Sequence, residues 1–204
     1  TISSDLGRIL AASVPGMSLS SNDGNNFAQT LRGRKPAFFI DGIPQSAELR
    51  GGGRDLRILH PSVLQRVEVI NGATSIYGLG GSGGVVNYIT KRPSDGDLEM
   101  FSEVGLGSSL SNISDDGLEF SVTQSASGKQ DKIDFVASIT YQTRGLYFDG
   151  DGDPIPPDPN GQTGIADMDE WSFFGKVGVE ITPNIRFEVM GMRYDAQVDT
   201  NYTV

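Results

Sequence analysis

The sequence predicts a small α+β unit followed by a run of antiparallel β-strands. Glycine accounts for 27 of the 204 residues and occurs in clusters, which favours turns and tight backbone approaches over a helical bundle. Residues 1–93 hold ten basic and six acidic side chains, whereas residues 94–204 hold six basic and twenty acidic ones. Beyond the polar segment 90–97, the apolar residues also change to a period of two, which is typical of strands. We therefore expect two domains, 1–93 and 94–204.

Composition excludes several classes of protein. The chain has no Cys, so neither a disulfide framework nor a thiolate metal site is possible. No stretch approaches the ~18 apolar residues of a membrane-spanning helix. The net charge of −10, without interleaved basic and aromatic residues, argues against nucleic acid as a partner. Thr1 leads directly into patterned sequence without a signal peptide, which indicates a processed or truncated chain.

The first unit should mix short helices and strands. A helix capped by Ser3 or Ser4 should place its apolar residues on one face and end at Pro15-Gly16. Runs of β-branched or aromatic residues bounded by Gly predict strands at 31–41, 67–70 and 84–90. Pro61 predicts the start of a short helix, and residues 74–77 should form a single turn.

The second unit should consist of strands alone. Alternation of apolar and polar residues predicts five strands of about ten residues, which begin near Leu98, Leu118, Ile133, Trp171 and Ile185. Their connections alternate between short turns and longer loops, as in outer-membrane barrels. A soluble sandwich would show the same alternation, so periodicity leaves barrel and sandwich equally open.

The segment Gly78–Gly84 contains G-x-G-x-x-G and, around Ser82, G-x-S-x-G. A dinucleotide loop or a nucleophile elbow needs a strand before the motif and a helix after it. Here a helical turn should precede the motif and a strand should follow it, which favours a structural glycine turn. His60 is the only His and leaves no His pair for a metal, so we expect it to be structural and expect no catalytic residue.

An acidic loop is the weak candidate for a metal site. Asp149, Asp151 and Asp153 stand at the first, third and fifth positions of a possible calcium loop. Pro154 occupies the sixth position, where Gly is needed, and Asn160 the twelfth, where Glu closes such a site. We therefore expect a solvated loop, with calcium binding as the weaker alternative.

A basic cluster is the stronger candidate for a binding site. Arg50, Arg54 and Arg57 surround three consecutive glycines. Arginines on such a loop can present a planar fork to carboxylate, hydroxamate or phosphate oxygens. The alternative is a solvated surface loop.

Several segments of the first unit occur in a distinctive order. They are Val14-Pro15-Gly16-Met17, Leu31-Arg32-Gly33, Phe39-Ile40-Asp41-Gly42, Leu64–Ala73, Ser75–Gly78 and Gly83–Pro93. Together they resemble the plug domain of TonB-dependent outer-membrane receptors, and the strands after Pro93 resemble the first barrel strands of that family. Within the family, the segments most similar to ferric aerobactin receptors are Arg32–Arg34, Asn71–Ser75, and Phe148–Asp153 with Gln162–Gly164.

The resemblance implies an α+β plug domain followed by antiparallel strands of an incomplete transmembrane β-barrel, which would be 22-stranded in the full protein. It also implies that the segment that contacts TonB and the rest of the barrel are not in this chain. Arg32 matches one basic residue of a plug-to-barrel charge lock. Asn71 stands where many relatives carry a second basic residue.

By the same resemblance, plug loops at 20–26, 33–36 and 44–54 should contact the ligand. The candidate ligand-binding residues in them are rich in hydrogen-bond donors: Asn22, Asn25, Asn26, Arg34, Lys35, Gln45, Arg50 and Arg54. Such a set suits an anionic, oxygen-rich ferric complex, because charge-assisted hydrogen bonds are roughly twice as strong as neutral ones. Alternatively, these arginines pair with acidic barrel loops.

The expected function is to bind a ferric siderophore and import it, driven by TonB, through the outer membrane of a Gram-negative bacterium. No catalysis and no cofactor are expected, and iron enters only within the transported chelate. The expected partners are the siderophore, TonB and outer-membrane lipid. The alternatives are the same transporter fold for haem, cobalamin or a glycan, a calcium-binding β-rich adhesin, and a hydrolase that uses Ser82.

The strand register then predicts two faces. The side chains expected to face lipid are Leu98, Met100, Val104, Leu118, Phe120, Val122, Phe135, Ile139, Val177 and Val179. Those expected to face the lumen or the plug are Glu99, Glu103, Glu119, Thr123, Ser138 and Lys176.

Overall fold

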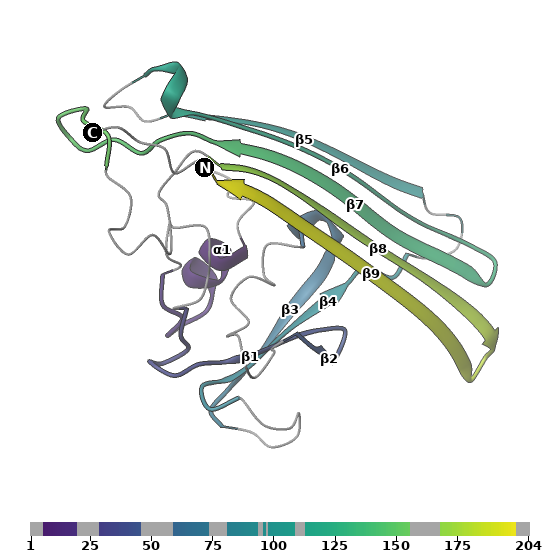
Figure 1. Cartoon of the computed structure of the whole chain (residues 1–204). Helices are drawn as coiled ribbons and strands as arrows, with labels where there is room; N and C mark the ends of the chain where they lie inside the picture. Colours follow the sequence, from purple (N-terminus) through teal and green to yellow (C-terminus); the bar gives the residue numbers. More distant parts are fainter. Residues whose placement is uncertain are drawn as a thin grey trace.

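The computed structural model describes residues 6–19, 29–45, 59–73, 81–93, 96, 98–108, 113–155 and 168–198. In these residues the chain forms a four-stranded and a five-stranded sheet, which lie against each other (Figure 1). The elements in chain order are α1 (Leu6–Ser13), β1 (Ala37–Ile40), β2 (Ile43–Pro44), the 3₁₀ helix η2 (Pro61–Val63), β3 (Leu64–Asn71), β4 (Gly84–Thr90), β5 (Leu98–Ser108), the 3₁₀ helix η3 (Asp115–Gly117), β6 (Leu118–Gln130), β7 (Ile133–Arg144), β8 (Met168–Thr182) and β9 (Ile185–Val198).

The four-stranded sheet has the order β2-β1-β4-β3. Strand β1 runs parallel to β4, and the other neighbours are antiparallel. Most of β4 is buried on both faces, as expected for a strand that carries the apolar side chains of Val85, Val86, Tyr88 and Ile89. The strand occupies the predicted residues 84–90, and η2 begins at Pro61 as predicted.

The predicted strand at 31–41 is wrong over its first half. Strand β1 contains only Ala37–Ile40, because Arg32 and Gly33 adopt positive φ angles of 54° and 74°. These angles turn the chain, and the backbone N–H and C=O groups of Leu31 and Arg34 hydrogen-bond to each other. A turn closed in this way cannot continue as extended strand.

Helix α1 packs Leu6 and Leu10 into the core and ends before Gly16, which has a φ of 86°. Its predicted caps, Ser3 and Ser4, lie outside the described residues, as does the turn predicted at 74–77. Among the described residues, no helix has the length and apolar character needed to cross a membrane.

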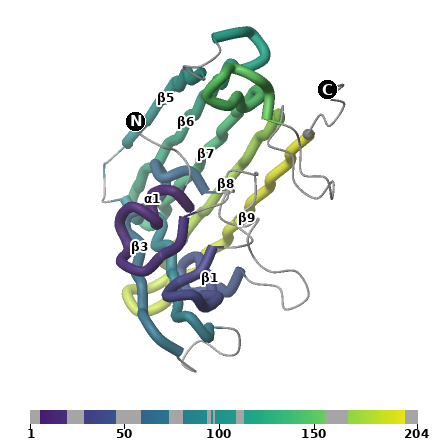
Figure 2. The backbone as a smooth tube through the Cα atoms, turned by 90° about the vertical axis from the view of Figure 1, so that its left-hand side faces the viewer, coloured from purple at the N-terminus to yellow at the C-terminus, as the bar shows by residue number. Residues whose placement is uncertain are grey.

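The five-stranded sheet, called the wall below, has the order β5-β6-β7-β8-β9 with antiparallel neighbours throughout. The five predicted strands are thereby confirmed. Two-residue turns join β6 to β7 and β8 to β9, whereas β7 and β8 are far apart in sequence. The sheet is not closed, and α1, β1 and β3 lie against one of its faces (Figure 2).

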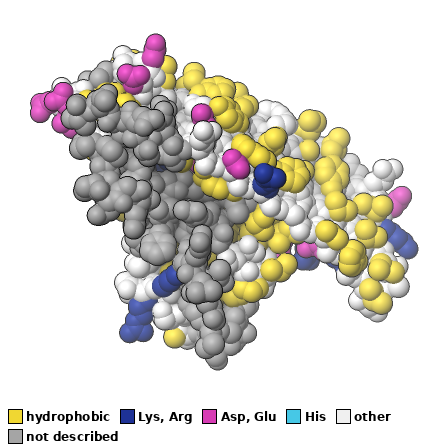
Figure 3. Space-filling model, in the orientation of Figure 1, with side chains coloured by type: hydrophobic (Ala, Val, Ile, Leu, Met, Phe, Trp, Pro, Cys, Tyr) yellow, Lys and Arg dark blue, Asp and Glu magenta, His cyan; other side chains and the backbone are white. Residues whose placement is uncertain are grey.

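The two faces of the wall have the predicted parity. Most of the side chains predicted to face lipid are exposed, among them Met100 at 71% and Val104 at 67%, while Val179 is half-buried. Thr123, Ser138 and Lys176 are buried on the opposite face. Figure 3 shows hydrophobic side chains spread over the visible part of the wall. Alternation therefore separates an apolar outer face from a polar face that the four-stranded sheet covers.

One hydrophobic core joins the two sheets. Val136 of β7 and Phe174 of β8 belong to the same buried cluster as Leu10, Ile40 and Tyr88 of the first unit. The wall therefore contributes fully buried apolar side chains to the packing of the smaller unit.

We predict that spin labels at Val122 and Thr123 of the full-length protein differ in access to a lipid-soluble quencher. Val122 is 37% exposed on the outer face, whereas Thr123 is 2% exposed and hydrogen-bonds to Thr140. Power-saturation electron paramagnetic resonance in bilayers measures this difference. Equal accessibility of the two labels would contradict the register.

Candidate functional site at the interface between the two sheets

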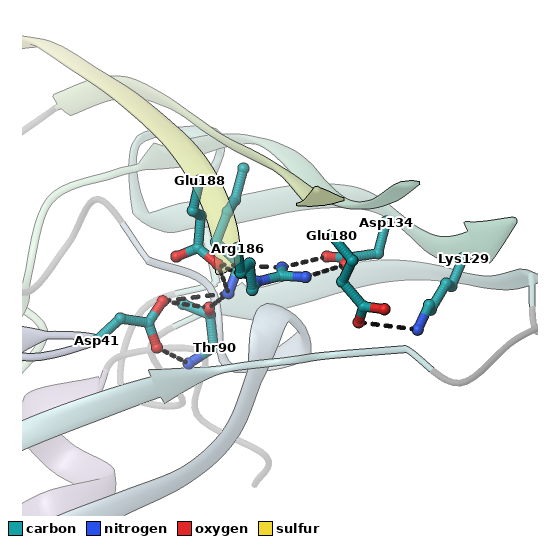
Figure 4. Close-up of polar contacts among 8 residues, drawn as sticks. Asp41, Thr90, Lys129, Asp134, Glu180, Arg186 and Glu188 are labelled. Carbon is teal, nitrogen blue, oxygen red and sulfur yellow. Dashed lines mark hydrogen bonds and ion pairs between the residues drawn. The ribbon is translucent and has the colours of Figure 1, made fainter. Parts of the chain in front are cut away.

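A buried lysine joins the two sheets. Lys176 of β8 has a fully buried side chain, and its Nζ lies 3.2 Å from Asp41 Oδ2 and 3.9 Å from Glu188 Oε2 of β9. Nζ also donates a hydrogen bond to Thr90 Oγ1. Asp41 and Thr90 belong to the four-stranded unit, so the contact crosses the interface (Figure 4). We call Asp41, Thr90, Lys176 and Glu188 the Lys176 cluster.

Local backbone geometry holds Asp41 in place. Asp41 and Gly42 have φ angles of 49° and 81° and form the two-residue turn between β1 and β2, as a type I′ hairpin requires. Asn87 Oδ1 accepts the Gly42 N–H at 3.0 Å. The Asp41 carboxylate accepts hydrogen bonds from the Thr90 backbone N–H at 2.9 Å and from its hydroxyl at 2.5 Å. These hydrogen bonds come from the same unit as Asp41, so they orient its carboxylate independently of the contact with Lys176.

The cluster continues along the wall as a chain of ion pairs. Arg186 of β9 bonds Asp134 of β7 in bidentate fashion, at 2.6 and 2.8 Å, and lies 3.1 Å from Glu188. Gly178 lies between them, and a Cβ there would collide with the Arg186 guanidinium. Nearer the turns, Lys129 pairs with Glu180 at 3.1 Å. Charges of both signs thus connect the four neighbouring strands β6 to β9 (Figure 4).

A second contact crosses the interface at β5. His60 caps η2, where its Nδ1 accepts the Ser62 N–H, and its Nε2 lies 3.7 Å from Glu103 Oε1. That distance is too long for a hydrogen bond, and Nε2 is buried without a partner among the described residues. Burial lowers the pKa of His60 below the ordinary 6.5, and the nearby Glu103 carboxylate offsets part of this effect.

The structure describes four of the nine residues predicted to bind ligand or to lock the plug. Arg34 and Lys35 lie beside the glycine turn, where the Lys35 carbonyl accepts the Gly83 N–H. Gln45 follows β2, and Arg32 forms no salt bridge with a described residue. The predicted residues outside the described part of the chain are Asn22, Asn25, Asn26, Arg50 and Arg54.

The acidic loop is organised by its own backbone. Asp149 Oδ1 accepts the N–H groups of both Asp151 and Asp153 at 3.0 Å. In the described part of the chain, no three acidic, His or Cys side chains gather closely enough to hold a metal ion. Ser82 Oγ reaches only the Lys35 carbonyl, at 3.4 Å, among described residues.

Sequence reasoning placed Lys176 on the inner face but did not connect it to Asp41 or Thr90. It also missed Asp134, Arg186 and Glu188. The sequence does indicate that Lys176 has an anionic partner, because a lysine at an inward position between Phe174 and Val177 needs a buried anion. The Asp41-Gly42 pair after a buried strand likewise predicts a type I′ turn.

The geometry is that of a small α+β domain held by ion pairs, as a plug, to the polar face of a β-sheet wall whose other face is apolar. Comparison with known proteins gives the same class. Residues 2–85 match the model of the TonB-dependent receptor plug domain. The chain belongs to the TonB-dependent receptor family.

The chain is similar to curated receptors over almost its whole length. It is 30% identical to the rhizobactin receptor of Rhizobium meliloti over 97% of this chain and 26% of that protein. It is 32% identical to the ferric aerobactin receptor of Klebsiella pneumoniae over 95% of this chain and 26% of that protein. The chain thus spans about a quarter of the length of these relatives.

The fold is also similar to solved structures. The copper transporter OprC superposes with a TM-score of 0.71 at 18% identity, over 96% of this chain and 29% of that one. At this identity the likeness concerns the fold alone.

We predict that Lys176→Met in the full-length receptor lowers the free energy of unfolding by about 3–5 kcal/mol, because it leaves the buried Asp41 carboxylate without its counter-ion. Lys91→Met is the matched control. Lys91 pairs with Glu99 at 3.1 Å, but the two side chains are 33% and 63% exposed, so its loss should cost about 0–1 kcal/mol. Denaturant unfolding in detergent measures both, and equal losses would contradict the assigned role of Lys176.

We predict that stability falls as the pH drops below 6.5, the ordinary pKa of His60. Because the folded-state pKa is lowered, the unfolded chain binds the proton first, so this contribution is complete above 6.5 and is lost as the pH falls through the folded pKa. His60→Asn keeps a capping acceptor but does not titrate. The difference in unfolding free energy between wild type and His60→Asn should therefore narrow on acidification, and a constant difference would exclude this linkage.

Proposed function

We propose that this chain is the plug and the first five wall strands of an outer-membrane receptor that binds a ferric siderophore and imports it, driven by TonB. The observation that carries the proposal is the Lys176 cluster, which binds the plug to the polar face of the wall by a buried contact. A domain held in this way closes a pore until force displaces it.

The cargo class rests on the relatives. Proteins named as receptors for rhizobactin and ferric aerobactin align with at least 95% of the chain at 30–32% identity. The likeness to a copper transporter concerns only the fold, so the cargo has to be tested directly. We keep the donor-rich plug loops as the proposed ligand site, with Arg34, Arg50 and Arg54 as its main cationic residues.

The proposed environment follows from the two faces of the wall. Large apolar side chains on one face suit outer-membrane lipid, as in the family, while the other face is polar and packs on the plug. The receptors and transporters of this family act by binding, and we propose that this chain does so too, without catalysis. In this scheme iron is cargo within the chelate and not a cofactor.

We predict that Arg34→Ala, Arg50→Ala or Arg54→Ala in the full-length receptor weakens binding of ferric aerobactin. Loss of one charged hydrogen bond should cost about 1.5–3 kcal/mol, or some tenfold to over a hundredfold in affinity. Equilibrium binding of the radioactive iron complex measures the change.

The control for this prediction is Arg66→Ala. Arg66 pairs with Glu68 on the surface of β3, with 54% and 44% of the two side chains exposed, so its removal should leave affinity unchanged. Unchanged affinity in all three test variants, with the fold intact, would remove an anion-binding pocket from these loops.

A further inference from the structure

A cavity separates the plug from the wall on the side of β5. Its volume is about 400 Å³, and its lining includes Ser62 and Val63 of η2, Phe101 of β5, Ser125 and Ser127 of β6, and Val136 of β7. We call it the serine cavity. Lys91 and Glu99, which pair at 3.1 Å and are both partly exposed, also line it.

The lining of the serine cavity combines polar residues, among them Ser125 and Ser127, with apolar ones such as Val63 and Phe101. Ser125 and Ser127 are only 6% and 4% exposed, and both line the cavity. Polar groups that line a cavity large enough for water are normally hydrated. The volume suffices for about a dozen water molecules at roughly 30 Å³ each. We therefore expect the cavity to be hydrated.

The opposite side of the plug is closed in a different way. At β8 and β9 the plug meets the buried Lys176 ammonium group and the apolar side chains of Phe174, Met190 and Met192. To separate the sheets there, water must enter an apolar contact and a buried ion pair must break. On the β5 side, we expect water to lie between the surfaces already.

We propose that the passage for the transported chelate opens through the serine cavity, along β5, β6 and β7, while the Lys176 cluster holds the plug to β8. This inference rests on the function proposed above and adds to it the location of the passage. The serines of the lining suit a hydrophilic, oxygen-rich cargo, because serine hydroxyls both donate and accept hydrogen bonds. The exposed ion pair between Lys91 and Glu99 is the weak charged contact that would have to open.

Thiol labelling tests the hydration of the cavity. Ser125→Cys and Ser127→Cys are compared with Ser138→Cys and Ser172→Cys, which replace serines on the same face that are equally buried, at 5% and 7% exposed, but do not line the cavity. The probe is a small water-soluble methanethiosulfonate, and the 204 residues contribute no native Cys to the background. In the purified full-length receptor, the cavity pair should react about tenfold faster or more. Equal rates for the two pairs would overturn the proposal.

Uptake by cells tests the passage itself. Labelled Ser127→Cys should import ferric aerobactin about tenfold more slowly or worse, should still bind it at the cell surface, and should recover when a reductant removes the label. Because the block is applied after folding and is reversible, a folding defect cannot mimic it. Full uptake by completely labelled Ser127→Cys would overturn the proposal.

The same assay separates this inference from the proposed function. If unlabelled Ser127→Cys and the wild type both import ferric aerobactin, failure of the block concerns only the location of the passage. If wild-type full-length receptor neither binds nor imports any ferric siderophore from a panel, the proposed function fails, and the passage proposal fails with it.

Discussion

The buried ammonium group of Lys176 is the constraint on which the rest of the interface depends. A charge with no exposed surface is tolerated only where an opposite charge and hydrogen-bond acceptors surround it. Asp41 and Thr90 supply these groups from the plug, and Glu188 adds a second carboxylate from the wall. Neither sheet alone supplies all the polar partners of Lys176. The interface therefore requires both the observed register of β8 and the observed hairpin at Asp41.

The interface is asymmetric, and the asymmetry has a physical consequence. On β8 and β9, a buried ion pair and apolar side chains form the contact, whereas the β5 side holds a partly polar cavity and the unsatisfied contact of His60 with Glu103. Separating dry surfaces costs more than separating hydrated ones. Under the proposed function, the plug would yield on the β5 side while it remains anchored at β8.

Much of the fold follows from local patterns. The boundaries of β4 could be predicted, because a strand that is buried on both faces is apolar along its length. The five wall strands and their two faces could be predicted, because a strand that is buried on one face alternates apolar and polar residues. The first half of the strand predicted at 31–41 was wrong, because Arg32 adopts a positive φ, which is uncommon for a residue of its type. The turn there depends on contacts with Gly16 and Gly83, which are distant in sequence.

The sequence by itself determined the two-unit organisation, the plug motifs and the inward position of Lys176, since each depends on residue type and short-range periodicity. It also gave the first unit an excess of basic side chains and placed Glu99, Glu103 and Glu119 on the inner face of the wall, which together indicate a basic plug against acidic wall residues. That complementarity is present at the exposed Lys91–Glu99 pair, but the buried pair has the opposite polarity, with the anion on the plug and the cation on the wall. Only the tertiary structure decided this, because Asp41 and Lys176 are 135 residues apart and no local pattern specifies which buried charges meet when two sheets pack.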